Sequence, residues 1–243
     1  MTFSKSLSLR ALRLFHKDLI PLNLSMHPTG DFISDWIRKN NRYYEFDMLH
    51  FMRRNFDYSR FLDIGANIGN HSHFFKSLGS TGWCFEPSSA NFKMLELNHY
   101  DGNFECFNLA LSNISTVDSL VTFEDARGNS YVQSTFDGNV NEWGSGMSIE
   151  KIETRTLDSF ELERPTLVKI DVEGSELKVL EGSVKTLLTW RPTVAIEIHE
   201  DETLSAGNFP YTRKNITDFF TNIGYSHFVL YNSTNHFFQS IEQ

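Results

Sequence analysis

The stretch Phe61-Leu-Asp-Ile-Gly-Ala-Asn-Ile-Gly-Asn70 decides the fold class of this chain. An apolar run of strand character leads directly into a glycine-containing turn, and apolar residues at helical spacing follow at Phe74, Phe75 and Leu78. Glycine lets the backbone turn tightly and approach a ligand, while the start of the following helix offers unpaired N–H groups. The stretch therefore predicts the first strand–turn–helix unit of an α/β protein, with a ligand at the turn.

Short apolar runs continue to alternate with helical stretches along the chain. We expect strands at Arg60–Ile64, Gly82–Glu86, Phe104–Leu109, Thr166–Asp171 and Thr193–His199. Two further apolar runs, Ser226–Tyr231 and His236–Ile241, are separated by a polar turn. The pattern predicts a mainly parallel sheet that ends in an antiparallel hairpin.

Length and composition are those of an ordinary globular protein with one domain. The chain has 243 residues, 40% of them hydrophobic and 22% charged, which excludes collagen-like, disordered and disulfide-stapled classes. The formal net charge is −9, although residues 1–60 carry ten Lys and Arg against six Asp and Glu. The acidic remainder is expected to repel nucleic acid and anionic membranes, so we predict no nucleic-acid partner.

The sequence predicts no segment that inserts stably into a membrane. Lys5, Arg10 and Arg13 interrupt the apolar residues at the start of the chain, which argues against a secretory signal and predicts a cytoplasmic location. The uncharged stretch 219–241 contains several Asn and His residues. A lipid-facing helix would not tolerate those side chains.

Two parts of different character are predicted along the chain. Residues 1–56 are expected to form an N-terminal helical extension, broken at Pro21 and around Pro28. Residues 57–243 hold the α/β domain. Within it, residues from about 112 to 156 lack a helical period and are rich in Gly, Asn and Ser. Such a long insertion in a compact domain predicts a lid or a substrate-binding surface.

The glycine turn and the end of the second expected strand both carry candidate ligand-binding residues. Asn67 and Asn70 stand where a dinucleotide-binding fingerprint has its second and third glycines, so a pyrophosphate would fit poorly. Asp63 places negative charge near the turn, which suits a cationic ligand. Glu86 ends the second strand, 23 residues after Asp63, where an acid can accept both hydroxyls of a ribose.

Charged residues follow the fourth and fifth expected strands. Alternation places Lys169, Asp171 and Glu173 on one face of the fourth strand. The same alternation places Glu197 and His199 together on the fifth strand. We expect these side chains to meet at the carboxyl edge of the sheet, where open α/β sheets bind ligands.

Taken together, these motifs resemble those of the FkbM-type methyltransferases, which are class I S-adenosylmethionine-dependent enzymes. The resemblance covers about Tyr44 to Glu200, and its most specific piece is the string Lys-Ile-Asp-Val-Glu-Gly at residues 169–174. The stretches that carry it are Phe61–Asn70, Phe85–Pro87, Asn108–Ser112, Thr156–Ser159, Val168–Gly174, Glu176–Gly182 and Val194–His199.

The resemblance implies a fold, a cofactor and a set of binding residues. The fold is a single seven-stranded, mostly parallel, Rossmann-like sheet with the C-terminal hairpin, so residues 57–243 become a class I methyltransferase domain. The cofactor is S-adenosylmethionine. The residues implied for it are Asp63, Gly65, Asn67 and Gly69 at the methionine end, Glu86 at the ribose, and Asn108, Leu109 and Ala110 beside the adenine.

The reaction implied is methyl transfer to a hydroxyl of a carbohydrate or secondary metabolite, so the partner is a small-molecule or glycan acceptor. The protein would mainly align the acceptor and remove a proton. A neutral imidazole suits the base role near pH 7, so His199 is the first candidate, followed by Asp171, with Lys169 positioning the acceptor. O-methylation is favoured because the Asn/Asp-Pro-Pro-Tyr string of amino-group methyltransferases is absent after the fourth strand.

Several alternatives stay open from the sequence. Asp171, Glu173, Glu197 and His199 could together hold a divalent cation that lowers the pKa of the acceptor hydroxyl, although we favour a reaction without metal. A nicotinamide or nucleotide enzyme would also use Glu86, but the missing glycines disfavour it. A non-catalytic cofactor-binding module is the third class. The acceptor and the oligomeric state are not determined.

Overall fold

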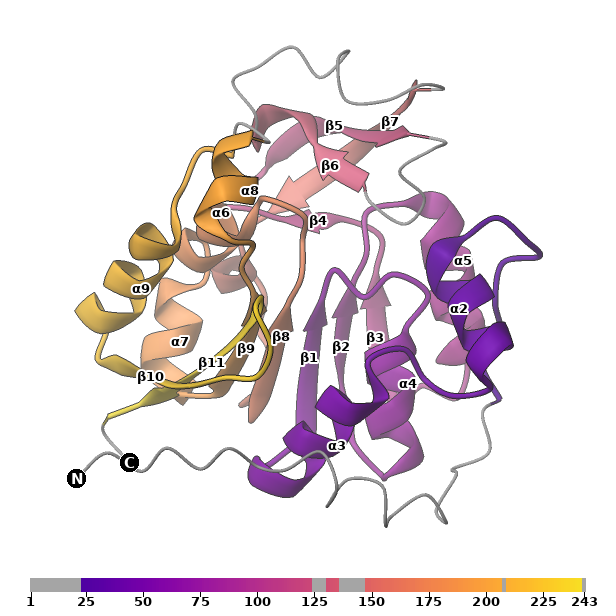
Figure 1. Ribbon diagram of the computed structural model, residues 1–243, viewed down its shortest axis with the longest axis horizontal. Helices are drawn as coiled ribbons and strands as arrows, with labels where there is room; N and C mark the ends of the chain where they lie inside the picture. The colour runs from indigo at the N-terminus through magenta and orange to yellow at the C-terminus, as the bar shows by residue number, and fades with distance from the viewer. Residues whose placement is uncertain (1–22, 124–129, 136–146, 207–208, 242–243) are drawn as a thin grey trace.

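A seven-stranded sheet lies at the centre of the described part of the chain (Figure 1). The computed structural model describes residues 23–123, 130–135, 147–206 and 209–241. The strand order is β10-β11-β9-β8-β1-β2-β3. The strands are β1 (Arg60–Ile64), β2 (Thr81–Phe85), β3 (Phe104–Phe107), β8 (Leu167–Ile170), β9 (Thr193–Glu197), β10 (Tyr225–Leu230) and β11 (Asn235–Ser240).

The sheet combines parallel and antiparallel pairing. Strand β1 pairs in parallel with β2 and β8, and the parallel region extends to β3 and β9. Strand β11 pairs antiparallel with both β9 and β10. The predicted α/β class and C-terminal hairpin are confirmed, whereas the sheet as a whole is mixed rather than mostly parallel.

Helices cover both faces of this sheet. Alternation along the strands sends Leu62 and Val168 to one face, where they pack with α6, α7 and α9. Phe61 and Leu167 point to the other face and pack with α3, α4 and α5. These helices are α3 (Phe46–Asn55), α4 (Asn70–Ser77), α5 (Ser89–Asn98), α6 (Glu176–Glu181), α7 (Val184–Trp190) and α9 (Arg213–Asn222). The short helix α8 (Asp201–Ala206) follows β9.

The predicted N-terminal helical extension is described only from residue 23 onward. It contains α2 (Phe32–Asn40) and α3. The Asp31 side chain caps α2 by accepting a hydrogen bond from the Ser34 N–H. Met48 and Met52 of α3 are buried against the main sheet. The domain boundary at residue 57 stays a prediction, and residues 1–22 lie outside the described part.

A second, four-stranded sheet lies beyond the carboxyl ends of the central strands (Figure 1). Its order is β4-β7-β5-β6, and its strands are β4 (Ala110–Leu111), β5 (Thr116–Phe123), β6 (Ser130–Val132) and β7 (Met147–Arg155). Strands β5, β6 and β7 come from the predicted insertion. Residues 124–129 and 136–146 of that insertion lie outside the described part. Within the part that is described, no helix is both long enough and apolar enough to cross a membrane.

The turn after β1 passes very close to the end of β8. Gly65 has φ +78°, and a Cβ added there would lie 1.8 Å from the carbonyl oxygen of Asp171. A larger side chain at Gly65 would therefore meet the protein backbone before it reached any ligand. Glycine is therefore required at this turn by the fold itself.

We predict that Gly65→Ala destabilises the protein more than Gly79→Ala does. Gly79 also has a positive φ, +92°, but a Cβ there would meet nothing within 4 Å. Gly79→Ala should cost about 1–2 kcal/mol of unfolding free energy for the left-handed backbone alone. Gly65→Ala should cost about 1–3 kcal/mol more, because the added methyl is overpacked. Urea unfolding of both variants measures the difference, and equal costs would contradict the close approach.

Candidate active site

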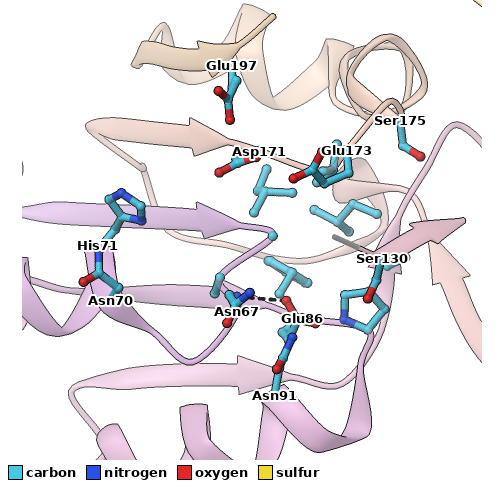
Figure 2. Close-up of a pocket in the computed structure, with 18 of the residues that line it drawn as sticks. Asn67, Asn70, His71, Glu86, Asn91, Ser130, Asp171, Glu173, Ser175 and Glu197 are labelled. Carbon is cyan, nitrogen blue, oxygen red and sulfur yellow. Dashed lines mark hydrogen bonds between the residues drawn. The ribbon is translucent and has the colours of Figure 1, made fainter. Parts of the chain in front are cut away.

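A pocket opens at the carboxyl ends of the central strands (Figure 2). The segments that follow β1, β2 and β8 contribute Gly65, Glu86 and Asp171, and Glu197 at the end of β9 also lines the pocket. The second sheet contributes Leu120 and other residues. The pocket therefore lies where open α/β sheets bind their ligands.

The turn after β1 and the end of β2 are joined through one carboxylate. The backbone N–H of Asn67 donates to Glu86 Oε2 at 2.8 Å, and the N–H of Ser88 donates to Glu86 Oε1 at 2.9 Å. Glu86 is only 5% exposed. Burial raises the pKa of Glu86 to about 7, although the hydrogen bonds from Ser88 and Asn67 oppose this shift. Each carboxylate oxygen keeps a lone pair for a ligand hydroxyl.

The residues predicted for the cofactor divide into two groups. Those that line the pocket are Gly65, Asn67, Glu86, Leu109 and Ala110. Those that do not line the pocket are Asp63, Gly69 and Asn108.

The residues of the second group support the structure around the pocket. Asp63 is fully buried, and its Oδ2 accepts a hydrogen bond from the Ser72 N–H of α4 at 3.0 Å. Gly69 is the N-cap of α4 with φ +87°. The Asn108 amide donates to the carbonyl oxygens of Glu86 and Pro87 at 2.9 and 3.0 Å. The structure thus places these three residues where they hold α4 and the segment after β2, and a direct role in cofactor binding stays a prediction.

Lys169 and Asp171 form an ion pair on the opposite side of the pocket. Lys169 is 2% exposed, and its Nζ lies 2.7 Å from Asp171 Oδ2. Burial alone would raise the pKa of Asp171, but the charge and hydrogen bond of Lys169 hold this pKa below its ordinary value. Asp171 lines the pocket, whereas Lys169 lies behind it. Lys169 therefore acts on the pocket through Asp171.

Glu197 lies next to this ion pair and differs from Asp171 in its protonation state. Burial, and then the negative charge of Asp171, raise the pKa of Glu197 to about 8. Its Oε1 accepts a hydrogen bond from Thr234 Oγ1 at 2.9 Å. Glu197 is therefore mostly protonated at neutral pH, so the pocket carries less negative charge than its side chains suggest.

His199 differs from the neutral, pocket-facing base expected from the sequence. Strand β8 ends at Ile170 and Glu173 has φ +50°, so strand alternation does not extend to these residues. His199 does not line the pocket, and its Nε2 lies 3.6 Å from Glu173 Oε2. The nearby Glu173 carboxylate raises the pKa of His199 to about 9, against the effect of burial. The imidazole is therefore protonated at neutral pH and holds the Glu173 carboxylate from behind.

Residues that the sequence analysis missed form the remaining wall. Phe32 and Tyr44 come from the N-terminal helical region, as does Glu45, while His71 comes from the first turn of α4. His71 Nε2 lies 3.0 Å from Glu45 Oε2. His71 comes directly after the glycine turn, so its position in the sequence could have identified it as a pocket residue. Nothing in the local sequence identifies Glu45 as a pocket residue, because only tertiary packing brings it to the pocket.

The described residues show no arrangement typical of a metal site. Among them, no group of three or more His, Cys, Asp and Glu side chains is arranged to hold a metal ion. Asp171, Glu173 and Glu197, which the sequence analysis offered as ligands with His199, instead contact Lys169, His199 and Thr234. The described residues therefore form no preformed site for the divalent cation that the sequence left open.

Comparison with known proteins identifies the family. The model of the methyltransferase FkbM domain matches residues 63–226. The chain belongs to the FkbM methyltransferase family. This confirms the resemblance inferred from the motifs and assigns the protein to the methyltransferases.

Individual relatives of this FkbM-family chain are distant. Hexuronic acid methyltransferase AglP of Haloferax volcanii is 32% identical over 140 residues, which cover 56% of this chain and 54% of that protein. The chain thus matches about half the length of this curated relative. A methyltransferase FkbM structure from Methylobacillus flagellatus is 18% identical, with a TM-score of 0.49, and covers 74% of this chain and 43% of that chain. A TehB-like SAM-dependent methyltransferase from Corynebacterium glutamicum is 8% identical, with a TM-score of 0.48, over 85% of this chain and 92% of that chain.

We predict that the buried acids make the ligand-free protein less stable at higher pH. The pKa values of Glu86 and Glu197 rise from 4.5 to about 7 and about 8 on folding. The folded state therefore holds protons that the unfolded state has released, so this contribution is complete below the unfolded pKa and is lost as pH rises through about 7–8. Glu197→Gln cannot ionise and should reduce the fall in Tm over this window.

Thermal unfolding followed by circular dichroism from about pH 5 to about pH 9 measures this effect. The exposed Glu161 provides the control, because Glu161→Gln should leave the pH profile of the wild type unchanged. Parallel Tm profiles for Glu197→Gln and the wild type would show that Glu197 is ionised at neutral pH in the folded state.

Proposed function

We propose that this chain is an S-adenosylmethionine-dependent O-methyltransferase that acts on a hydroxyl of a carbohydrate. The observation that carries the proposal is a single pocket with two chemically different ends in a chain of the FkbM family. Glu86 lies at one end, and Asp171 and Glu197 lie at the other. One end suits a nucleoside, and the other suits a hydroxyl-rich acceptor.

The first end fits the cofactor that the family implies. Glu86 would accept hydrogen bonds from the ribose hydroxyls, while Leu109 and Ala110 would pack beside the adenine. Gly65 and Asn67 would hold the methionine part at the turn after β1. Carboxylates on the pocket wall favour a cationic sulfonium. When bound, S-adenosylmethionine supplies an activated methyl group, so the protein needs mainly to align the acceptor and take its proton.

The second end fits a sugar. Ionised carboxylates such as Asp171 accept hydrogen bonds from hydroxyls, and Lys169 fixes Asp171 in place. Phe32, which is 50% exposed, and Tyr44 provide aromatic surface on the same pocket. The similarity to a hexuronic acid methyltransferase supports a carbohydrate acceptor.

We predict that the affinity for S-adenosylhomocysteine depends on ionised Glu86. Binding should weaken as pH falls below about 7, because the protonated carboxyl is a poorer acceptor for the ribose hydroxyls. Glu86→Gln should weaken binding by about 1.5–3 kcal/mol and remove this pH dependence. Calorimetry measures both effects, with Glu105→Gln on the exposed side of β3 as the control. A folded Glu86→Gln protein with wild-type affinity would exclude the ribose role.

We predict methylation of a hydroxyl in a panel of methyl glycosides of glucose, galactose, glucuronic acid and galacturonic acid. Each sugar is incubated with the enzyme and S-adenosylmethionine, and mass spectrometry detects the gain of one methylene. The product is then treated with alkali, because a methyl ether survives and a methyl ester is hydrolysed. No product with any sugar would contradict the carbohydrate assignment, and an alkali-labile product would contradict transfer to a hydroxyl.

A further inference from the structure

The pair Glu45–His71 lines the acceptor end of the pocket but has no role in the function described so far. His71 is 7% exposed and lies in the first turn of α4, directly after the glycine turn. Its Nε2 lies 3.0 Å from Glu45 Oε2. The Asn235 amide of β11 donates to the other oxygen, Glu45 Oε1, at 3.3 Å. Three distant parts of the chain therefore fix one imidazole in the pocket wall.

The backbone of Glu45 indicates that its side chain is held for this contact. Glu45 is the N-cap of α3 with φ +53° and ψ +32°, a left-handed conformation that non-glycine residues rarely adopt. Its side chain makes no capping hydrogen bond to α3. Strained residues of this kind persist where the surrounding structure over-determines them, and they cluster at functional sites. Here the carboxylate is directed to His71 and Asn235 instead of to the helix.

The hydrogen bond between Glu45 and His71 determines which ring nitrogen of His71 can accept a proton. Burial would raise the pKa of Glu45, but the hydrogen bond from His71 and the charge of Lys169 hold it below its ordinary value. Glu45 is therefore an ionised carboxylate, which can only accept hydrogen bonds. His71 Nε2 must then be the donor. In the neutral imidazole this leaves Nδ1 without a proton and able to take one.

Asp171, Glu197 and His199 are poorer candidates for a base at the acceptor end. Lys169 stabilises the charged form of Asp171 and so reduces its basicity. Glu197 already holds a proton at neutral pH, and His199 is protonated and lies outside the pocket lining. An efficient general base must reach the reacting hydroxyl and be free of its proton near the working pH.

We propose that His71 is the general base of the methyl transfer and that Glu45 is its positioning residue. This inference rests on the proposed function. The acceptor oxygen forms a bond to the methyl carbon, the C–S bond breaks with its electron pair retained by sulfur, and the hydroxyl proton goes to His71 Nδ1. Glu45 fixes the imidazole orientation and stabilises the imidazolium that forms. The proton then leaves to solvent when the products depart.

The kinetic test uses the sugar of the methyl glycoside panel that the wild type methylates fastest. His71→Gln should lower kcat by about 10²–10⁴-fold, because the amide can donate to Glu45 but has no basic nitrogen. The affinity for S-adenosylhomocysteine should stay within about twofold of the wild type, since Glu86 and the turn after β1 are unchanged. Glu45→Gln should cause a smaller loss of kcat. The fall of kcat at acid pH should disappear in His71→Gln.

His73 provides the matched control on the same helix. It is buried, its Nδ1 lies 2.8 Å from the Tyr43 hydroxyl, and it does not line the pocket. His73→Gln should keep the wild-type kcat and its acid limb, with Tm measured for every variant. Wild-type kcat in a folded His71→Gln protein would overturn the proposal.

Nitrogen NMR of the imidazole in the complex with S-adenosylhomocysteine provides a readout that does not depend on turnover. In the neutral imidazole we expect His71 to carry its proton on Nε2 and none on Nδ1, and Glu45→Gln should disturb this preference. A proton on Nδ1 of the wild type would overturn the base assignment. If the wild type methylates none of the sugars, the proposed function fails, while the NMR result still decides whether the pair has the required tautomer.

Discussion

The close approach of the turn after β1 to the end of β8 is the constraint on which the site depends. The carbonyl oxygen of Asp171 occupies the space that a Cβ of Gly65 would fill. Two neighbouring parallel strands can bring their carboxyl ends together in this way only when one of them continues through a residue without a side chain. Because of this contact, the Glu86 end and the Asp171 end belong to one pocket.

The electrostatics of the acceptor end follow from burial at that edge. Burying an ion pair costs desolvation energy, and this cost is offset only when geometry and further hydrogen bonds are good. Lys169 and Asp171 meet this condition at 2.7 Å. A second ionised acid beside them would lack a partner, so Glu197 takes up a proton instead. Asp171 therefore stays ionised on the pocket wall, while Glu197 adds no second negative charge beside it.

The positions at the sheet edge that the sequence analysis anticipated are those that local sequence determines. Glu86 and Asp171 directly follow apolar strands, so their placement at the sheet edge needs only the strand boundaries. Asp63 lies one residue before the end of β1, and alternation turns it into the core, where it binds the start of α4. The protonation of His199 depends on Glu173 in a turn with positive φ, which no periodicity shows. For His199, a tertiary neighbour rather than the local pattern decides the outcome.

The region that defines the family does not contain the whole pocket. The FkbM match begins at residue 63 and ends at residue 226, yet Tyr44 and Glu45 line the pocket from before it and Asn235 braces Glu45 from after it. Residues within the match supply Glu86, Asp171 and Glu197 of the pocket lining. The flanking segments instead shape the wall that an acceptor would touch. Selection for a new acceptor can therefore alter these segments without disturbing the close approach of β1 and β8 that assembles the catalytic edge.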